Sequence, residues 1–156
     1  MLEPVANLSR IRPLVLADLP GVARVVHSSA EAAQWVPSPI DLASGGIRGL
    51  ICLEEEQIVG FIAFRIVADE MEVFNLAVSP SHRRKGAGSS LLAAAIEMAL
   101  ESHAIVMFLE VRESNAAAIS FYAKRGFALS GRRSAYYRNP TETALCLRRK
   151  LALLPG

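Results

Sequence analysis

The sequence predicts an α/β (α+β) fold in which a mixed sheet of about six to seven strands carries helices on both faces. Short runs rich in β-branched and aromatic residues alternate with segments whose apolar residues recur at helical spacing. The order along the chain is strand, two helices, three strands, helix, strand, helix and two strands, which fits sheet and helix layers. The run "IVMFLEVR" at 105–112 is apolar on both faces, so we expect a central, buried strand there.

The first half of the chain begins with a strand near residues 9–12 and a helix from about 18 to 29. Asp18 is the expected N-cap of this helix, and Pro20 falls in its first turn. Prolines and a glycine pair interrupt residues 31–46, so we expect a loop with one short helix. Three strands follow, expected near 49–54, 58–67 and 71–78.

The second half contains two further helices and three strands. A helix is expected over 87–102 because its apolar residues share one face, namely Leu91, Leu92, Ala95, Ile96, Ala99 and Leu100. After the strand at 105–112, a helix begins at Ser114 or Asn115, and Gly126 supplies the left-handed residue that ends it. The last two strands are expected near 127–137 and 143–150.

Length, hydropathy and charge limit the class of protein. The 156 residues fit a single domain over 1–156. Apolar residues make up 52% of the chain and the mean hydropathy is +0.31, yet no apolar run reaches the roughly 18 residues of a membrane span. The N-terminus has no apolar stretch typical of a signal peptide. A net charge of +2 is too weakly basic for a nucleic-acid-binding protein, so we expect neither nucleic acid nor membrane as a partner. The sequence leaves the oligomeric state open.

The cysteine and histidine content predicts no metal site. Cys52 and Cys146 each lie in an apolar run without metal-ligand spacing, so we expect buried free thiols and a cytoplasmic location. The three histidines are isolated in sequence, and we assign none of them a catalytic or metal-binding role.

Positive charge gathers at two places, which indicates a phosphate-bearing ligand or an acidic patch on a partner. One is residues 83–85, and the other comprises Lys124, Arg125, Arg132 and Arg133.

The stretch "HRRKGAGSSLL" at 82–92 predicts a phosphate cradle. It opens a helix whose first N–H groups lack intrahelical partners, and the helix dipole adds positive charge there. Gly86 and Gly88 allow close approach of the backbone, while Arg84 and Lys85 add full charges, which suits a pyrophosphate. The stretch contains neither GxxxxGK[ST] nor GxGxxG, so a P-loop and a dinucleotide fingerprint are excluded. The alternative is a solvated basic turn, which charge alone would favour.

The spacing Arg83-x-x-Gly86-x-Gly88 resembles the acetyl-CoA signature of the GCN5-related N-acetyltransferase (GNAT) family. The stretches "VFNLAVSPSHRRKGAGSSLL", "LEVRESNAAAISFYAKRGF" and "RRSAYYRNP" resemble its RimI type, the ribosomal-protein-alanine N-acetyltransferases. The resemblance runs from about residue 58 to 147. It implies the GNAT fold, with a mixed, mostly antiparallel central sheet, and acetyl-CoA as cofactor. It further implies that residues 84–89, namely Arg84, Lys85, Gly86, Ala87, Gly88 and Ser89, bind that cofactor.

Glu110, near the end of the central strand, is the candidate general base. Ligands of open α/β sheets bind at such strand ends, and apolar neighbours would raise the pKa of a carboxylate into a useful range. The alternative is a structural ion pair with Arg112, two residues further on the same strand face. By sequence alone the two interpretations stand evenly. The resemblance assigns Glu110 the role of base.

Tyr122 is the candidate general acid. Asn115, Ile119 and Tyr122 share one helix face, where an amide and a phenol could both meet a ligand. The alternative is a core tyrosine with an N-cap asparagine, which the spacing alone favours. The resemblance implies that Tyr122 protonates the CoA sulfur and that Asn115 contacts the cofactor.

Asn75 interrupts an apolar strand, which suggests a β-bulge at a binding site. The resemblance implies that the backbone of Leu76, Ala77 and Val78 binds the acetyl group and pantetheine. The alternative is an ordinary strand with one polar residue facing outward.

The acceptor side is expected around Trp35, Tyr136 and Tyr137. Adjacent strand residues point to opposite faces, so at most one tyrosine faces the acceptor and the other belongs to the core. The RimI type tends to carry a Phe-Pro-Trp stretch near Trp35, whereas "AAQWVPSP" keeps the tryptophan and moves the proline.

These features together predict an acetyl-CoA-dependent Nα-acetyltransferase that acts by direct transfer. The expected acceptor is the N-terminal alanine of a ribosomal small-subunit protein, protein eighteen. One alternative acceptor class is small amines or other protein N-termini. A CoA-sensing interaction module is the alternative outside enzymes, and the presence of both Glu110 and Tyr122 argues against it.

Overall fold

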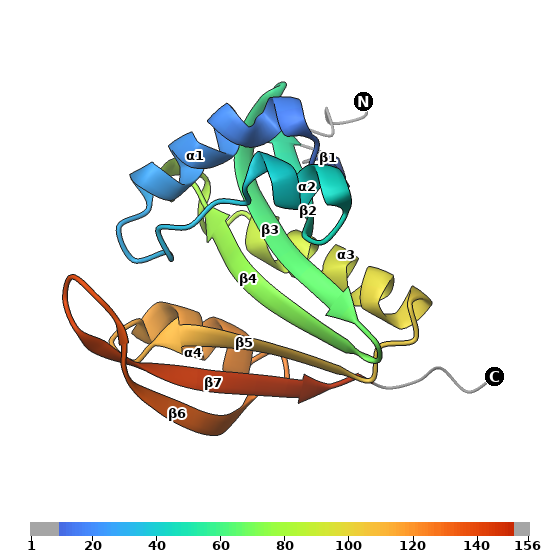
Figure 1. Cartoon of the computed structure of the whole chain (residues 1–156). Coiled ribbons are helices and arrows are strands. Elements are labelled where there is room, and N and C mark those ends of the chain that lie inside the picture. The colour runs from blue at the N-terminus through green and yellow to red at the C-terminus, as the bar shows by residue number, and fades with distance from the viewer. Residues whose placement is uncertain (1–9, 152–156) are drawn as a thin grey trace, which may run out of the picture. The chain divides into compact units, whose positions relative to one another are not determined.

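The protein's structure, a computed structural model, describes residues 10–151 and shows a seven-stranded sheet with helices in that range (Figure 1). The strands are β1 (Arg10–Pro13), β2 (Arg48–Glu54), β3 (Gln57–Val67), β4 (Glu70–Val78), β5 (Val106–Arg112), β6 (Ala128–Tyr137) and β7 (Glu142–Lys150). The helices are α1 (Leu19–Ser28), α2 (Pro39–Ser44), α3 (Ala87–Glu101) and α4 (Ala116–Ala123), with short 3-10 turns η1 (Leu16–Asp18) and η2 (Pro80–His82).

Hydrogen bonds order the strands as β1-β2-β3-β4-β5-β7-β6. The β4–β5 pair is parallel, whereas β1–β2, β2–β3, β5–β7 and β6–β7 are antiparallel. The predicted mixed, mostly antiparallel sheet is therefore confirmed, and the predicted elements agree with the structure to within a few residues at each end.

The chain divides into two compact units. The first comprises the residues up to Arg65 together with Asn75–Glu97, and the second comprises Ile66–Phe74 together with the chain from Met98 onward. The prediction of one domain over 1–156 stays a prediction.

Helices cover both faces of the first unit's strands. Val22, Val25 and Val26 of α1 pack against the β2 and β3 side chains that share the core cluster, including Phe61. The preceding residue of β3 is Gly60, and its Cα hydrogens face the opposite side of the sheet. A Cβ added there would lie 3.2 Å from Leu91 of α3, so this helix approaches the sheet closely at a glycine. Figure 1 shows α1 in front of β3 and α3 behind it.

Asp18 occupies the N-cap position of α1, but its carboxylate does not cap the helix. It accepts two hydrogen bonds from Arg12, at 2.8 and 2.9 Å, and one from the Val15 N–H at 2.8 Å. The Arg12 hydrogen bonds lower the pKa of this buried carboxyl. The expected capping role is therefore corrected, because a charged partner within reach is worth more to a carboxylate than a backbone N–H alone.

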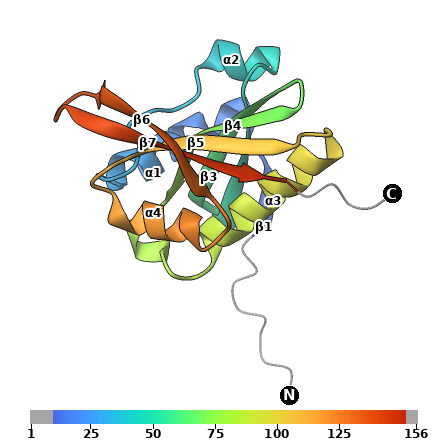
Figure 2. The same cartoon turned by 90° about the horizontal axis from the view of Figure 1, so that it is seen from below.

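The second unit contains α4 against β5, β6 and β7 (Figures 1 and 2). Tyr122 packs edge-on against Phe121 and Phe127, with ring centroids 5.2 and 5.3 Å away. Gly126 ends the helix with φ +88°, as predicted. Its N–H donates to the Ala123 carbonyl at 3.2 Å, and the Phe127 N–H donates to the Tyr122 carbonyl at 3.1 Å, which is the Schellman pattern.

Two burial expectations need correction. Strand β5 lies between β4 and β7, but burial alternates from Met107 onward, and Phe108, Glu110 and Arg112 are only half-buried. Cys52 is buried as expected, whereas Cys146 is half-buried. The reason is the same for both, since Phe108, Glu110 and Cys146 line a pocket.

Candidate active site

The predicted phosphate cradle opens α3 in the first unit. Gly86 has φ +87°, and a Cβ added to it would meet no atom within 4 Å. The first bond of the helix runs from the Ser90 N–H to the Gly86 carbonyl at 2.9 Å, so the preceding N–H groups point out of the helix start. Arg84 and Lys85 are exposed. This open, positively charged turn fits a pyrophosphate.

Arg83 is the first residue of the signature spacing, and its side chain binds other groups of the protein. Its guanidinium forms an ion pair with Glu31 and donates from Nε to the Val78 carbonyl at 3.2 Å. Arg83 therefore fixes the turn to the end of β4 and to the loop after α1. Arg84 and Lys85 form no ion pair within residues 10–151, which leaves them for a ligand.

Asn75 is buried on the same face of β4 as the core residue Ala77, so the alternative of an ordinary strand with an outward-facing polar residue does not hold. Its side-chain amide donates to the carbonyls of Ala33 and Trp35, at 2.8 and 3.0 Å. This explains the polar residue in an apolar strand, because it satisfies two backbone groups of the loop that carries Trp35. The predicted β-bulge stays a prediction.

The Trp35 loop is held at several points in the first unit. The Trp35 side chain is half-buried and packs against the core cluster. Ser29 Oγ donates to the Val78 carbonyl at 3.2 Å. The acceptor-binding role of Trp35, and the role of Leu76, Ala77 and Val78 toward the acetyl group, stay predictions.

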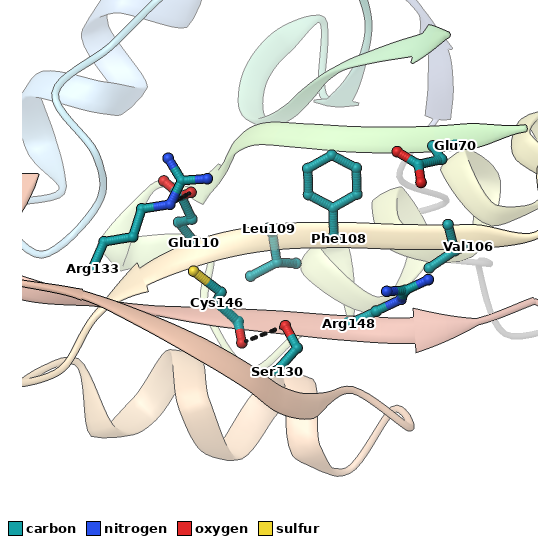
Figure 3. Close-up of a pocket in the computed structure, with 9 residues that line it drawn as sticks. All are labelled: Glu70, Val106, Phe108, Leu109, Glu110, Ser130, Arg133, Cys146 and Arg148. Atoms are coloured by element: carbon teal, nitrogen blue, oxygen red, sulfur yellow. Dashed lines mark hydrogen bonds and ion pairs between the residues drawn. The ribbon is translucent and has the colours of Figure 1, made fainter. Parts of the chain in front are cut away.

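In the second unit, Glu110 projects from β5 toward two donors on β6. Arg133 Nε lies 3.2 Å from Glu110 Oε1 (Figure 3). The Tyr136 hydroxyl hydrogen-bonds to the same carboxylate. The Glu110 side chain is 21% exposed, so it is shielded yet still reachable from solvent. The suggested structural partner Arg112 is not the residue that pairs with Glu110.

Arg112 instead supports Tyr137. Its guanidinium stacks 4.4 Å from the centroid of that ring and pairs with Glu142 at 3.3 Å. Glu142 Oε2 also accepts a 2.6 Å hydrogen bond from the Ser114 N–H, which ties β7 to the start of α4. Three members of the second predicted basic group already have partners within the protein: Arg125 stacks on Phe121, Arg132 pairs with Glu113, and Arg133 pairs with Glu110.

Tyr136 and Tyr137 contact each other, so the prediction that they face opposite sides is wrong. Their ring centroids are 5.1 Å apart with an interplanar angle of 86°. The pairing of β6 with β7 shifts register between Arg133 and Tyr137, and Ala135 has φ +53°. This irregular segment breaks strand alternation and brings both rings to the Glu110 side. Tyr136 is 48% exposed and Tyr137 is half-buried, so neither belongs to the core.

Both tyrosines keep their protons over a wide pH range. The hydrogen bond to Glu110 raises the pKa of Tyr136, and burial together with the charge of Glu110 raises the pKa of Tyr137 to about 12. At neutral pH the Tyr136 hydroxyl is therefore a donor to the carboxylate.

Tyr122 is 5% exposed, and burial raises its pKa well above the ordinary value of a phenol. Its ring thus matches the core alternative, while the hydroxyl stays protonated, as a proton donor requires. Asn115 is the N-cap of α4, and its Oδ1 accepts a hydrogen bond from the Ala118 N–H at 3.1 Å. The acid role of Tyr122 and the cofactor contact of Asn115 stay predictions.

A pocket of about 260 Å³ lies along the face of β5 that carries Glu110. Phe108 and Cys146 line its middle, and Glu70 and Arg148 line the end away from Glu110 (Figure 3). The register of β5 and β7 explains why these residues line one pocket, since Cys146 lies opposite Glu110, and Arg148 lies opposite Phe108.

Sequence reasoning missed Arg133 and Cys146 as members of this site. Cys146 could not be placed opposite Glu110 from the sequence, because the register between β5 and β7 was not known. Arg133 could not be placed, because a register shift between Leu129 and Gly131 precedes it in β6 and breaks the alternation of faces. Within residues 10–151, no cluster of His, Cys, Asp and Glu is arranged to hold a metal ion, and none of the helices there is long and apolar enough to cross a membrane.

The fold and this site define a transferase of the acetyl-CoA-binding type. The chain belongs to the acetyltransferase (GNAT) family, whose model matches residues 17–127, and it is an acetyl-CoA-dependent N-acetyltransferase. The ribosomal protein bS18-alanine N-acetyltransferase of Salmonella typhimurium is 33% identical over 132 residues, which cover 83% of this chain and 88% of that protein.

Two solved structures extend this similarity. The crystal structure of the ribosomal-protein-S18-alanine N-acetyltransferase from Escherichia coli matches with a TM-score of 0.80 and 28% identity, covering 96% of this chain and 97% of that one. Ard1 from Thermoplasma volcanium matches with a TM-score of 0.79 and 25% identity, covering 92% of this chain and 98% of that one.

Proposed function

We propose that this enzyme transfers the acetyl group of acetyl-CoA to the N-terminal alanine of a ribosomal small-subunit protein, and acts in the cytoplasm. Support comes from the relatives whose names state this substrate, which match most of the chain. The observation that carries the proposal is the half-buried Glu110, held by Arg133 and Tyr136 beside a pocket.

Glu110 is proposed to remove the proton of the acceptor amine, through a water molecule. An α-amino group has a pKa of about 8, so at neutral pH it is mostly protonated and cannot attack. Arg133 and Tyr136 orient the carboxylate, and such positioning is what general-base catalysis requires.

The first unit is proposed to bind the acetyl donor. Acetyl-CoA supplies the thioester that the amine attacks. The turn at residues 84–89 would hold the pyrophosphate through backbone N–H groups, Arg84 and Lys85. The backbone of residues 76–78 would hold the acetyl group and pantetheine and donate to the thioester oxygen as it gains negative charge.

Tyr122 is proposed to give its proton to the departing CoA sulfur, and Asn115 to contact the cofactor. A buried phenol with a raised pKa stays protonated until the thiolate forms beside it. Transfer is direct, with no covalent intermediate on either cysteine.

The test is thiol release from acetyl-CoA with a peptide that begins with the N-terminal alanine of the ribosomal protein. An identical peptide with a blocked N-terminus is the control. Release with the free peptide alone supports both the chemistry and the acceptor class. Free small amines, and peptides that begin with other residues, complete the panel. Stronger turnover of a small amine would overturn the peptide acceptor while leaving the acetyltransferase chemistry intact.

A further inference from the structure

The pocket beside Glu110 continues well past the carboxylate. Its lining runs along β5 from Glu110 to Val106, which is four residue steps. At about 3.3 Å per step, this is roughly 13 Å. One amino acid amide spans a single step, so a small amine at Glu110 would leave most of this groove empty.

The chemistry of the groove changes along its length. Next to Glu110, the walls are Phe108, Cys146 and Ser130, and Ser130 Oγ already donates to the Cys146 carbonyl at 3.1 Å. At the far end, Glu70 from β4 and Arg148 from β7 stand on either side (Figure 3). Both are exposed, and neither forms an ion pair within residues 10–151. An apolar middle and charges of both signs at the end suit a chain that carries side chains and a polar backbone.

We propose that this groove binds the first four or so residues of an extended acceptor polypeptide, with the reactive amine at Glu110 and the chain running toward Glu70 and Arg148. The groove selects a polypeptide N-terminus over a small amine. The inference rests on the proposed function only for the position of the amine at Glu110.

Binding beyond the first residue is equal in the ground state and the transition state, so it lowers KM and leaves kcat nearly unchanged. The experiment measures kcat and KM for a series of C-terminally amidated peptides of one to six residues, all beginning with alanine. We expect KM to fall on the order of tenfold from alanine amide to the tetrapeptide and then to level off. An equal KM for alanine amide and hexapeptide would overturn the proposal.

Ser130→Trp places a large ring in the middle of the groove, and the length dependence of KM is expected to disappear. The matched control is Leu129→Trp, since Leu129 is an exposed neighbour on the same strand that does not line the pocket. Thermal melting of both variants establishes that they fold. Loss of the length dependence in both variants alike would count against the groove.

A second measurement does not depend on turnover. Cys146 is half-buried in the groove, whereas Cys52 is fully buried, and the chain has no other cysteine. In the presence of a CoA analogue that lacks the thiol, the hexapeptide should slow alkylation of Cys146 by N-ethylmaleimide clearly more than alanine amide does, because only the longer chain fills the groove around the thiol. Mass spectrometry of the labelled peptide identifies the site.

The two proposals fail in different ways. Protection of Cys146 without acetylation of any peptide would support the groove and refute the proposed function. Acetylation of alanine peptides at a length-independent KM, with Cys146 unprotected, would support the function and overturn the groove.

Discussion

The carboxylate of Glu110 lies between the Arg133 guanidinium and the Tyr136 hydroxyl. Replacement by Gln keeps the shape and removes the basic oxygen. We expect Glu110→Gln to lower kcat on the order of 10²-fold or more, which is typical for a general base. Acetyl-CoA binding, measured by calorimetry, should stay near normal. An unchanged kcat across the pH range would remove Glu110 from this role.

Arg133 is expected to act as a positioning residue for Glu110. Arg133→Gln should lower kcat about tenfold with little change in KM, since the carboxylate loses one of its two orienting donors. Arg133→Lys should restore part of the loss. The control is Arg132→Gln, which makes the same charge change at the next residue, where the partner is Glu113. Similar losses in both arginine variants would point to a general effect of charge.

Tyr122→Phe tests the acid with little change in packing, because the ring keeps its contacts with Phe121 and Phe127. We expect kcat to fall on the order of 10²-fold and the melting temperature to stay within a few degrees. The raised pKa of Tyr122 means that the wild type should show no loss of activity from this residue between pH 6 and about 9. Wild-type turnover in Tyr122→Phe would leave the tyrosine as a core residue only.

At the scale of single elements, two glycines share a left-handed conformation, and we expect them to have different roles. Gly86 and Gly126 have φ values of +87° and +88°, and neither lacks room for a Cβ. An alanine at either position is strained by about 1 kcal/mol. We therefore expect Gly86→Ala and Gly126→Ala to lower the free energy of unfolding by similar amounts. Only Gly86→Ala should weaken acetyl-CoA binding, measured by titration calorimetry.

Equal affinity of both glycine variants for acetyl-CoA would contradict the assignment of residues 84–89 to the pyrophosphate. Gly131→Ala is the reference for both, since Gly131 has open space and no positive φ.

At the scale of the whole molecule, β3, β4 and α3 each run through both compact units. Because continuous elements join them, we propose that the units unfold together as one domain, in a single thermal transition.

The stability of the folded state at acid pH should depend on Asp18. Its pKa is lowered in the folded state, so its contribution to stability is present above the unfolded pKa of about 4 and is lost as the pH falls through the folded value. Asp18→Asn should cost about 2 kcal/mol at neutral pH, through the Arg12 hydrogen bonds. The variant and the wild type should then converge in thermal melts as the pH falls through the lowered pKa of Asp18. A constant difference at all pH values would exclude this charge effect.

The sequence by itself determined the helices and strands, because these depend on local properties. Hydrophobic periodicity predicted a helix over 87–102, which the structure shows as Ala87–Glu101, and Gly126 predicted the left-handed end of α4. Glu110 could be singled out as a carboxylate in an apolar strand.

Only the tertiary structure decided the partners of these residues, since partners come from register and irregularity rather than from spacing along the chain. The two register shifts of β6 bring Arg133, Tyr136 and Tyr137 to Glu110, and strand pairing brings Cys146 opposite it. The polar side chain of Asn75 in an apolar strand is likewise explained only by the structure. It donates to the carbonyls of Ala33 and Trp35, which lie 42 and 40 residues away along the chain. A side chain's neighbours across a sheet are set by non-local hydrogen bonds, and a one-residue shift reverses which face it occupies.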